Sequence, residues 1–118
     1  MGMPQSVIDV SSTIEIAKAI VEVNRSLDLR QAGLAALWAL YYAPKQTLPR
    51  ARLEQEFGLL ADHFGAYARR VAEQLGVEKP DALPLVNSWL DQDGIEMITL
   101  KPSVVTAIRS HAFSRIAQ

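Results

Sequence analysis

The chain has 118 residues, with 12 Lys and Arg against 13 Asp and Glu, and it contains no cysteine. This length fits one domain that buries its core without disulfides or metal. The lack of cysteine excludes a disulfide framework, a zinc site with cysteine ligands and a thiol nucleophile. The balanced charge excludes a uniformly basic nucleic-acid coat, so any DNA-binding face must come from local clustering of cations.

Residues 1–12 are expected to be a flexible N-terminus, and residues 13–118 are expected to form a single domain. The N-terminal segment has neither the basic start nor the long apolar run of a secretory signal. The longest uncharged run, between Arg30 and Lys45, is shorter than the roughly 20 residues that a membrane-spanning helix needs. The predicted location is therefore cytoplasmic, with no membrane partner.

A capping box made by Ser12 and Glu15 predicts a helix that continues to about Leu27. Its apolar residues recur at helical spacing in two adjacent rows: Ile16, Ile20, Val23 and Leu27 in the first, and Ile14, Ala17 and Val21 in the second. This apolar arc is too wide for a helix that contacts a single neighbour. Two explanations remain open: the first row forms a homodimer interface, or the helix is buried deep in its own domain.

Asp28 is the predicted N-cap of the next helix, with Gln31 in the third helical position. Residues 32–43 are apolar all round, which is typical of a helix at the centre of a domain, and Pro44 ends this helix. Tyr41 and Tyr42 are expected to close the core, with their hydroxyl groups reaching water or a backbone carbonyl.

Residues 47–48 are expected to be extended, because the residue before Pro49 avoids helical dihedral angles. Pro49 then suits the first turn of a short helix that ends at Gly58 and has Leu53 and Phe57 on one face. Asp62 is the expected N-cap of a longer helix that ends at Gly76. Its apolar face is predicted from the spacing of Phe64, Tyr67, Ala68, Val71, Ala72 and Leu75.

Two structures are possible for residues 80–100. Residues 95–100 are typical of a strand, and Asp93-Gly94 before them favours a hairpin with residues 83–90 as the partner strand and Trp89 near Ile98. Alternatively, residues 84–92 form a helix, since their apolar residues also fit helical spacing. In both cases a final helix follows, built on Val104, Val105, Ile108, Ala112 and Ile116.

The sequence contains no glycine-rich phosphate loop and no nucleophile elbow. His63 and His111 are solitary, and the paired acids Asp91 and Asp93 are expected in a solvated turn. We therefore expect no enzyme activity, no cofactor and no metal site.

The expected elements are mainly helical with a small β-hairpin, in the order of a winged helix with an extra N-terminal helix. The chain resembles the MarR type of bacterial winged-helix regulator over residues 28–109. The resemblance rests on Leu29-Arg30-Gln31-Ala32 at the start of an apolar helix, on residues 48–58 as the short helix before the reader helix, and on Asp91-Gln92-Asp93-Gly94 followed by residues 95–102 as the wing and its strand.

This resemblance implies a small dimeric DNA-binding protein, a transcriptional regulator that contacts double-stranded DNA with its reader helix and wing. The implied reader residues are His63, Ala66, Arg69 and Arg70. The implied backbone contacts are Lys45, Arg50, Arg52 and Lys101.

A second hypothesis is a winged-helix module for protein interaction or dimerisation that does not bind DNA. It follows from the balanced total charge and from a wing that is acidic at Asp91, Asp93 and Glu96. On this view Arg69 is simply solvated and pairs with Glu73 four residues later. If residues 84–92 are instead helical, the reader side chains become Asn87, Ser88, Asp91 and Gln92.

Overall fold

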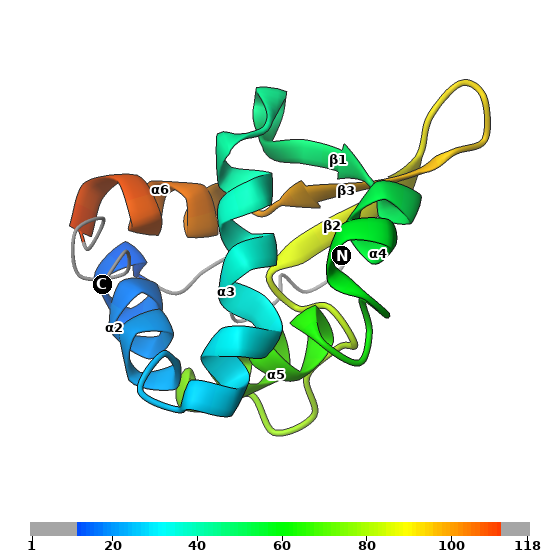
Figure 1. Cartoon of the computed structure of the whole chain (residues 1–118). Helices are drawn as coiled ribbons and strands as arrows, with labels where there is room; N and C mark the ends of the chain where they lie inside the picture. The colour runs from blue at the N-terminus through cyan, green and yellow to red at the C-terminus, as the bar shows by residue number, and fades with distance from the viewer. Residues whose placement is uncertain (1–11, 112–118) are drawn as a thin grey trace.

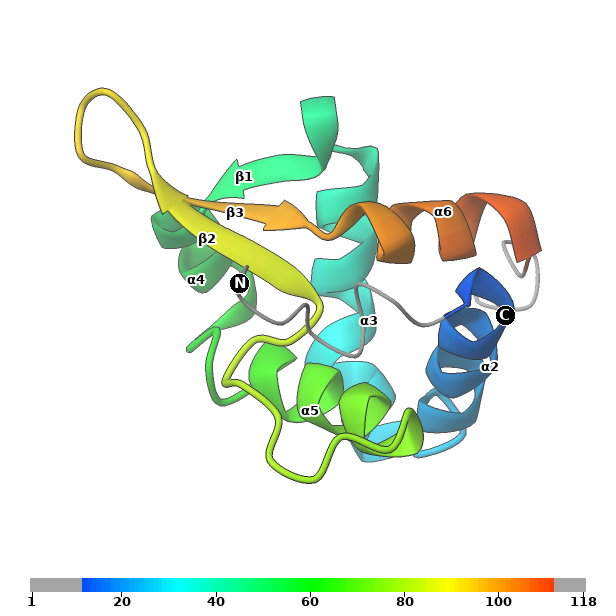
Figure 2. The same ribbon diagram turned by 180° about the vertical axis from the view of Figure 1, so that it is seen from behind.

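The computed structural model of the protein describes residues 12–111 (Figures 1 and 2). Its elements in chain order are α2 (Thr13–Val23), α3 (Leu27–Tyr42), the 3-10 turn η1 (Pro44–Gln46), β1 (Thr47–Pro49), α4 (Arg50–Phe57), α5 (Phe64–Gln74), β2 (Val86–Leu90), β3 (Glu96–Leu100) and α6 (Pro102–His111). Helices and one small antiparallel sheet make up the fold, which confirms the predicted fold class at this coarse level. The expected flexible N-terminus lies outside the described residues except for Ser12, and so do Ala112 and Ile116.

The boundary between the first two helices differs from the prediction. The Ser12 hydroxyl accepts a hydrogen bond from the Glu15 N–H at 3.2 Å, which confirms the expected cap of α2. The helix ends at Val23, however, and Ser26 rather than Asp28 is the N-cap of α3. Both residue types cap helices well, and the chain uses the earlier one, so that Asp28 lies in the first turn of α3, where its negative charge faces the positive end of the helix.

The sheet confirms the hairpin and contradicts the alternative helix over residues 84–92. Its strand order is β1-β3-β2, with β3 antiparallel to both neighbours. Trp89 lies opposite Met97 rather than Ile98. The connecting loop is long enough to keep Asp91 away from Glu96, since the Asp91 carboxylate instead accepts the N–H groups of Asp93 and Ile95 at 2.8 and 2.9 Å.

Helices α4 and α5 follow the predicted apolar spacing. The side chain of Leu53, a residue of α4, is fully buried. The helix ends at Gly58, whose positive φ of 84° favours glycine. In α5 the predicted apolar face is buried over Phe64, Tyr67, Ala68, Val71 and Ala72. His63, not Asp62, occupies the N-cap position, and its side chain makes no capping hydrogen bond.

The apolar first row of α2 is buried within the chain. Helix α2 packs against α5 and α6, and Figure 1 shows α2 and α6 together at one end of the molecule. Ile16, Ile20 and Val23 are almost completely inaccessible to solvent. The predicted homodimer interface on this row is therefore wrong for these three residues, because the domain's own helices cover them. Leu27, the fourth, is 65% exposed at the start of α3.

Helices α3 and α5 cross closely at Gly33. A Cβ atom at this position would overlap the side chain of Tyr67, so only glycine allows this approach. The Tyr67 hydroxyl donates a hydrogen bond of 2.7 Å to the Asn24 side-chain oxygen in the α2–α3 turn. The core of the described structure therefore joins α2, α3 and α5 at one point.

The end of α3 is less buried than the sequence indicates. Tyr42 is an exposed residue and stacks on Trp38 with a centroid distance of 5.8 Å, so Tyr42 does not close the core. The chain then turns through Lys45 and Gln46, which are not glycines yet have positive φ values of 55° and 50°. No helix among residues 12–111 is long and apolar enough to cross a membrane.

Candidate interaction surface around the wing

The predicted reader residue Arg69 is held by backbone groups of its own chain. Its guanidinium donates to the carbonyl oxygens of Ala61 at 3.3 Å and Ala82 at 3.1 Å. The segment that precedes β2 therefore lies beside the N-terminal half of α5, where a Cβ on Gly65 would be 2.9 Å from the Ala82 oxygen. Part of the predicted DNA-reading face is covered, and Ala66 beside it is only partly exposed.

The other predicted reader side chains are also engaged. Arg70 pairs with Glu73 at 3.0 Å, so Glu73 takes Arg70 as its partner rather than the expected Arg69. The His63 ring lies close to Gly58 at the end of α4, where an added Cβ would be 2.8 Å from the ring. Arg70 therefore already has an acidic partner, in an exposed pair of modest strength.

The predicted phosphate-binding arginines of α4 are neutralised by acids. Arg50 bonds to Glu54 and to Glu96 of the wing, each at 3.0 Å, and Arg52 bonds to Glu56 at 3.3 Å. The hydrogen bonds to Glu96 and Glu54 raise the pKa of Arg50, and the bond from Arg50 is the main cause that lowers the pKa of Glu96. Arg50 therefore joins α4 to the wing as an ion-pair partner.

The two predicted lysines lie in different surroundings, one at the end of β3 and one before β1. Lys101 is only 9% exposed, and its ammonium group donates to the Asn87 side-chain oxygen at 3.0 Å. Side chains alternate between sheet faces along a strand, so Lys101 follows the face opposite to that of Glu96 and its partner Arg50. Lys45 is exposed in the turn before β1. Lys101 and Arg50 therefore bond to residues on opposite faces of the sheet.

The wing, residues 86–100, carries exposed apolar side chains that the sequence analysis did not single out. Trp89, Leu90 and Ile95 are 46%, 68% and 48% exposed. The acidic side chains of Asp91 and Asp93 follow directly, and Figure 1 shows the loop projecting away from the helices. The adjacent pair Trp89-Leu90 could have predicted an exposed apolar side chain, because two consecutive large apolar residues in a strand cannot both face one core.

Trp89 and Leu90 lie on opposite faces of the hairpin. The Trp89 indole N–H donates to the Thr99 hydroxyl at 2.8 Å, and the Thr99 and Thr47 hydroxyls are also 2.8 Å apart, so this row crosses all three strands. Leu90 is paired with Glu96 on the other face, on the side of α4. The end of the wing is therefore apolar on both of its surfaces.

Strand β2 is an edge strand of the sheet that residues 12–111 form (Figure 2). The Asp91 N–H bonds to Ile95 and the Leu85 carbonyl to Lys101, so the odd-numbered residues direct their backbone groups toward β3. The backbone groups of Ser88 and Leu90 therefore point outward, and no strand within residues 12–111 pairs with them. The edge contains no proline, charge or bulge, the usual features that prevent further pairing.

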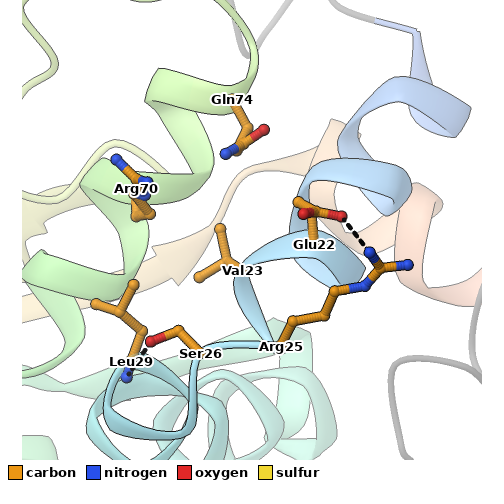
Figure 3. A pocket seen from close by; sticks show the side chains of 7 residues that line it. All are labelled: Glu22, Val23, Arg25, Ser26, Leu29, Arg70 and Gln74. Atoms are coloured by element: carbon orange, nitrogen blue, oxygen red, sulfur yellow. Dashed lines mark hydrogen bonds and ion pairs between the residues drawn. The ribbon is translucent and has the colours of Figure 1, made fainter.

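A separate pocket of about 550 Å³ lies between the end of α2 and α5 (Figure 3). It is lined by Glu22, Val23, Arg25, Ser26, Leu29, Arg70 and Gln74. Its two arginines have acidic partners, since Arg25 pairs with Glu22 at 3.3 Å and Arg70 pairs with Glu73. The pocket therefore presents no concentrated charge to a ligand.

Comparison of the chain with protein-family models, curated proteins and solved structures finds no match.

Proposed function

We propose that this chain is a protein-interaction domain of winged-helix-like architecture and that the wing is its docking surface. The arrangement is supported by the order α3, β1, α4, α5, β2, β3, in which two helices are followed by a hairpin that projects from the sheet. The observation that carries the proposal is the exposed apolar end of the wing at Trp89, Leu90 and Ile95. Single exposed apolar residues are normal on a protein surface, but several gathered at one projecting end are typical of protein contacts.

The test uses a photo-crosslinking residue at position 90 in cells that naturally express the protein. We expect covalent protein adducts from position 90 and none from position 55, since Gln55 is also an exposed residue but lies on α4. Adducts at neither position, or at both with equal yield, would contradict a docking role for the wing.

The second candidate is a DNA-binding regulator, and the same order of helices and wing favours it. It requires Arg69 and Arg70 to face DNA, although both have partners in the chain. Fluorescence anisotropy with a labelled mixed-sequence duplex at low salt tests it. We expect no binding; binding that falls steeply with salt and is lost in the double variant Arg69→Ala, Arg70→Ala would favour DNA.

A further inference from the structure

The outer edge of β2 offers backbone groups to a partner. The N–H and C=O groups of Ser88 and Leu90 point away from β3. Pairing is confined to this short stretch, because the Val86 N–H bonds to the Leu83 carbonyl before the strand and a turn follows Leu90. The edge can therefore accept one short added strand.

The apolar side chains at the end of the wing favour an added strand over a flat contact. Trp89 is 46% exposed on one face of the hairpin, and Leu90 is 68% exposed on the other. A partner that docks on one face alone leaves the other apolar side chain in water. Successive residues of an added strand lie on opposite faces of the sheet, so such a strand covers part of both side chains at once.

The charge of the wing defines the chemistry of the partner. Residues 86–100 contain three acids and no lysine or arginine. Glu96 is paired with Arg50 of α4. Neither Asp91 nor Asp93 has an ion-pair partner within residues 12–111. The tip of the wing therefore carries negative charge that a basic partner would complement.

The other end of β2 is mixed in charge. The preceding residues 78–82 carry two acids and one lysine. Arg69 bonds to the Ala82 carbonyl, and Lys101 bonds to the Asn87 side chain. The uncompensated charge of the wing thus lies at one end of the edge, and this gives a bound segment a direction.

We propose that the edge of β2 binds an extended segment of another protein, antiparallel to β2, with apolar residues beside Trp89 and Leu90 and basic residues at its N-terminal end. This inference rests on the proposed function, because it names the class of partner for the same wing. The antiparallel direction matches the sheet, in which both described strand pairs are antiparallel. In this direction the N-terminal end of the segment passes Leu90 and reaches the loop that carries Asp91 and Asp93.

A synthetic peptide tests the chemistry of the partner. The probe Lys-Lys-Val-Val-Thr-Val-Thr, labelled at its C-terminal end, places its first valine opposite Leu90 and both lysines beside the wing tip. The control Val-Val-Thr-Val-Thr-Lys-Lys moves the cations to the other end, and the control Glu-Glu-Val-Val-Thr-Val-Thr reverses the charge. In fluorescence anisotropy with the full chain, we expect the probe to bind about fivefold more tightly than the first control and about tenfold more tightly than the second. Added salt should reduce both differences.

Hydrogen exchange locates the contact on the strand. Saturating probe should slow exchange of the Ser88 and Leu90 amides by about tenfold. The Trp89 amide should change little, because it already points toward β3.

A substitution in β2 tests the added backbone bonds. Ser88→Pro removes the central outward N–H without removing a bond to β3, and should weaken binding of the probe by about tenfold. Ser88→Ala is the matched control, because it also lacks the hydroxyl but keeps the N–H. Circular dichroism of both variants verifies that they remain folded.

A charge reversal at the wing tip tests the direction from the side of the protein. Asp93→Lys should weaken binding of the Lys-Lys probe and strengthen binding of the Glu-Glu control peptide. Glu78→Lys is the matched control, since Glu78 is also an exposed acid but lies outside the wing. Equal effects of the two substitutions would contradict recognition by the wing tip.

The outcomes separate this inference from the proposed function. Equal binding of the probe and its controls, or binding that leaves the Ser88 and Leu90 amides unprotected, overturns the added strand. If position 90 still forms protein adducts in cells, the wing docks in another way and the proposed function stands. Slow exchange of the two amides without probe also overturns the inference. In dilute protein it would show that the chain's own residues cover the edge, and if it needs concentrated protein it would show that a second copy does.

Discussion

Tyr67 is a titratable residue in the core of the protein. Its side chain is fully buried, and its hydroxyl donates to the Asn24 side-chain oxygen at 2.7 Å. Burial is the main cause that raises the pKa of Tyr67 above its ordinary value. The side-chain nitrogen of Asn24 is buried and has no hydrogen-bond partner. The hydroxyl therefore acts as a donor that stays protonated in the folded state.

We expect Tyr67→Phe to lower the free energy of unfolding by about 1–2 kcal/mol, because Asn24 loses its remaining side-chain bond. The native chain should also lose stability as the pH rises above about 10, where tyrosine ionises in the unfolded state but not yet in the folded state. Tyr67→Phe should lack this alkaline contribution. Urea unfolding at several pH values measures both effects, with Tyr42→Phe on the surface as control. An unchanged alkaline slope in Tyr67→Phe contradicts the argument.

Local residue roles were predictable from sequence only where the partner is close in the chain. The Ser12 cap and the left-handed Gly58 depend on neighbouring residues, and both were predicted. The partners of the arginines were not, because the Arg50–Glu96 pair joins residues 46 positions apart. Arg69 bonds to a carbonyl 13 residues away, and spacing along one helix cannot indicate this.

At the scale of elements, the Arg50–Glu96 ion pair fixes the wing against α4. Both side chains are about one-third exposed, so water screens the pair only in part. The bond from Arg50 lowers the pKa of Glu96. The ion pair's contribution to stability is therefore complete above the ordinary carboxylate pKa. The contribution is lost as the pH falls through the lowered value.

We expect Glu96→Gln to reduce stability at neutral pH by less than about 1 kcal/mol, as for other partly exposed pairs. It should also flatten the loss of stability between neutral and acidic pH. Amide hydrogen exchange should become faster in residues 90–96 of the variant, because the wing loses its link to α4. Glu78→Gln, at an exposed position outside these elements, is the matched control. Equal exchange in both variants would show that the wing is held by other contacts.

Element types were predictable in proportion to the length of their pattern. The apolar spacing of α5 extends over three turns, and its buried face was identified correctly. The hairpin remained open to a helical alternative because β2 has only five residues, and Leu85, Val86 and Trp89 fit both periods. The α2–α3 boundary was misplaced because Ser26 and Asp28 are both suitable caps.

For the whole molecule, α2 is part of one continuous hydrophobic core. Ile16 and Ile20 are fully buried between α2 and the helices α5 and α6. The sequence analysis left burial and dimerisation open, since a wide apolar arc indicates how much surface is covered but not by which chain. The structure assigns this surface to the chain itself.

We expect Ile20→Asp to unfold the protein rather than to produce a folded monomer, because a buried unpaired carboxylate is strongly destabilising. Thermal unfolding followed by circular dichroism should show loss of the cooperative transition. Ile14→Asp is the control, since Ile14 lies on the same helix but is about half exposed. A stable, folded Ile20→Asp protein with reduced mass in sedimentation would instead restore the dimer interface on α2.

The central position of β3 in the strand order has a consequence for how the chain folds. Its contacts with β2 are local, whereas its contacts with β1 join residues 47–49 to 97–99. Closing this second pairing encloses α4, α5 and β2 in one large loop and carries the entropy cost of that closure. The hairpin can therefore form early, while the sheet is completed only when β3 has met the distant β1. A fragment that ends before β3 lacks the strand that joins the other two.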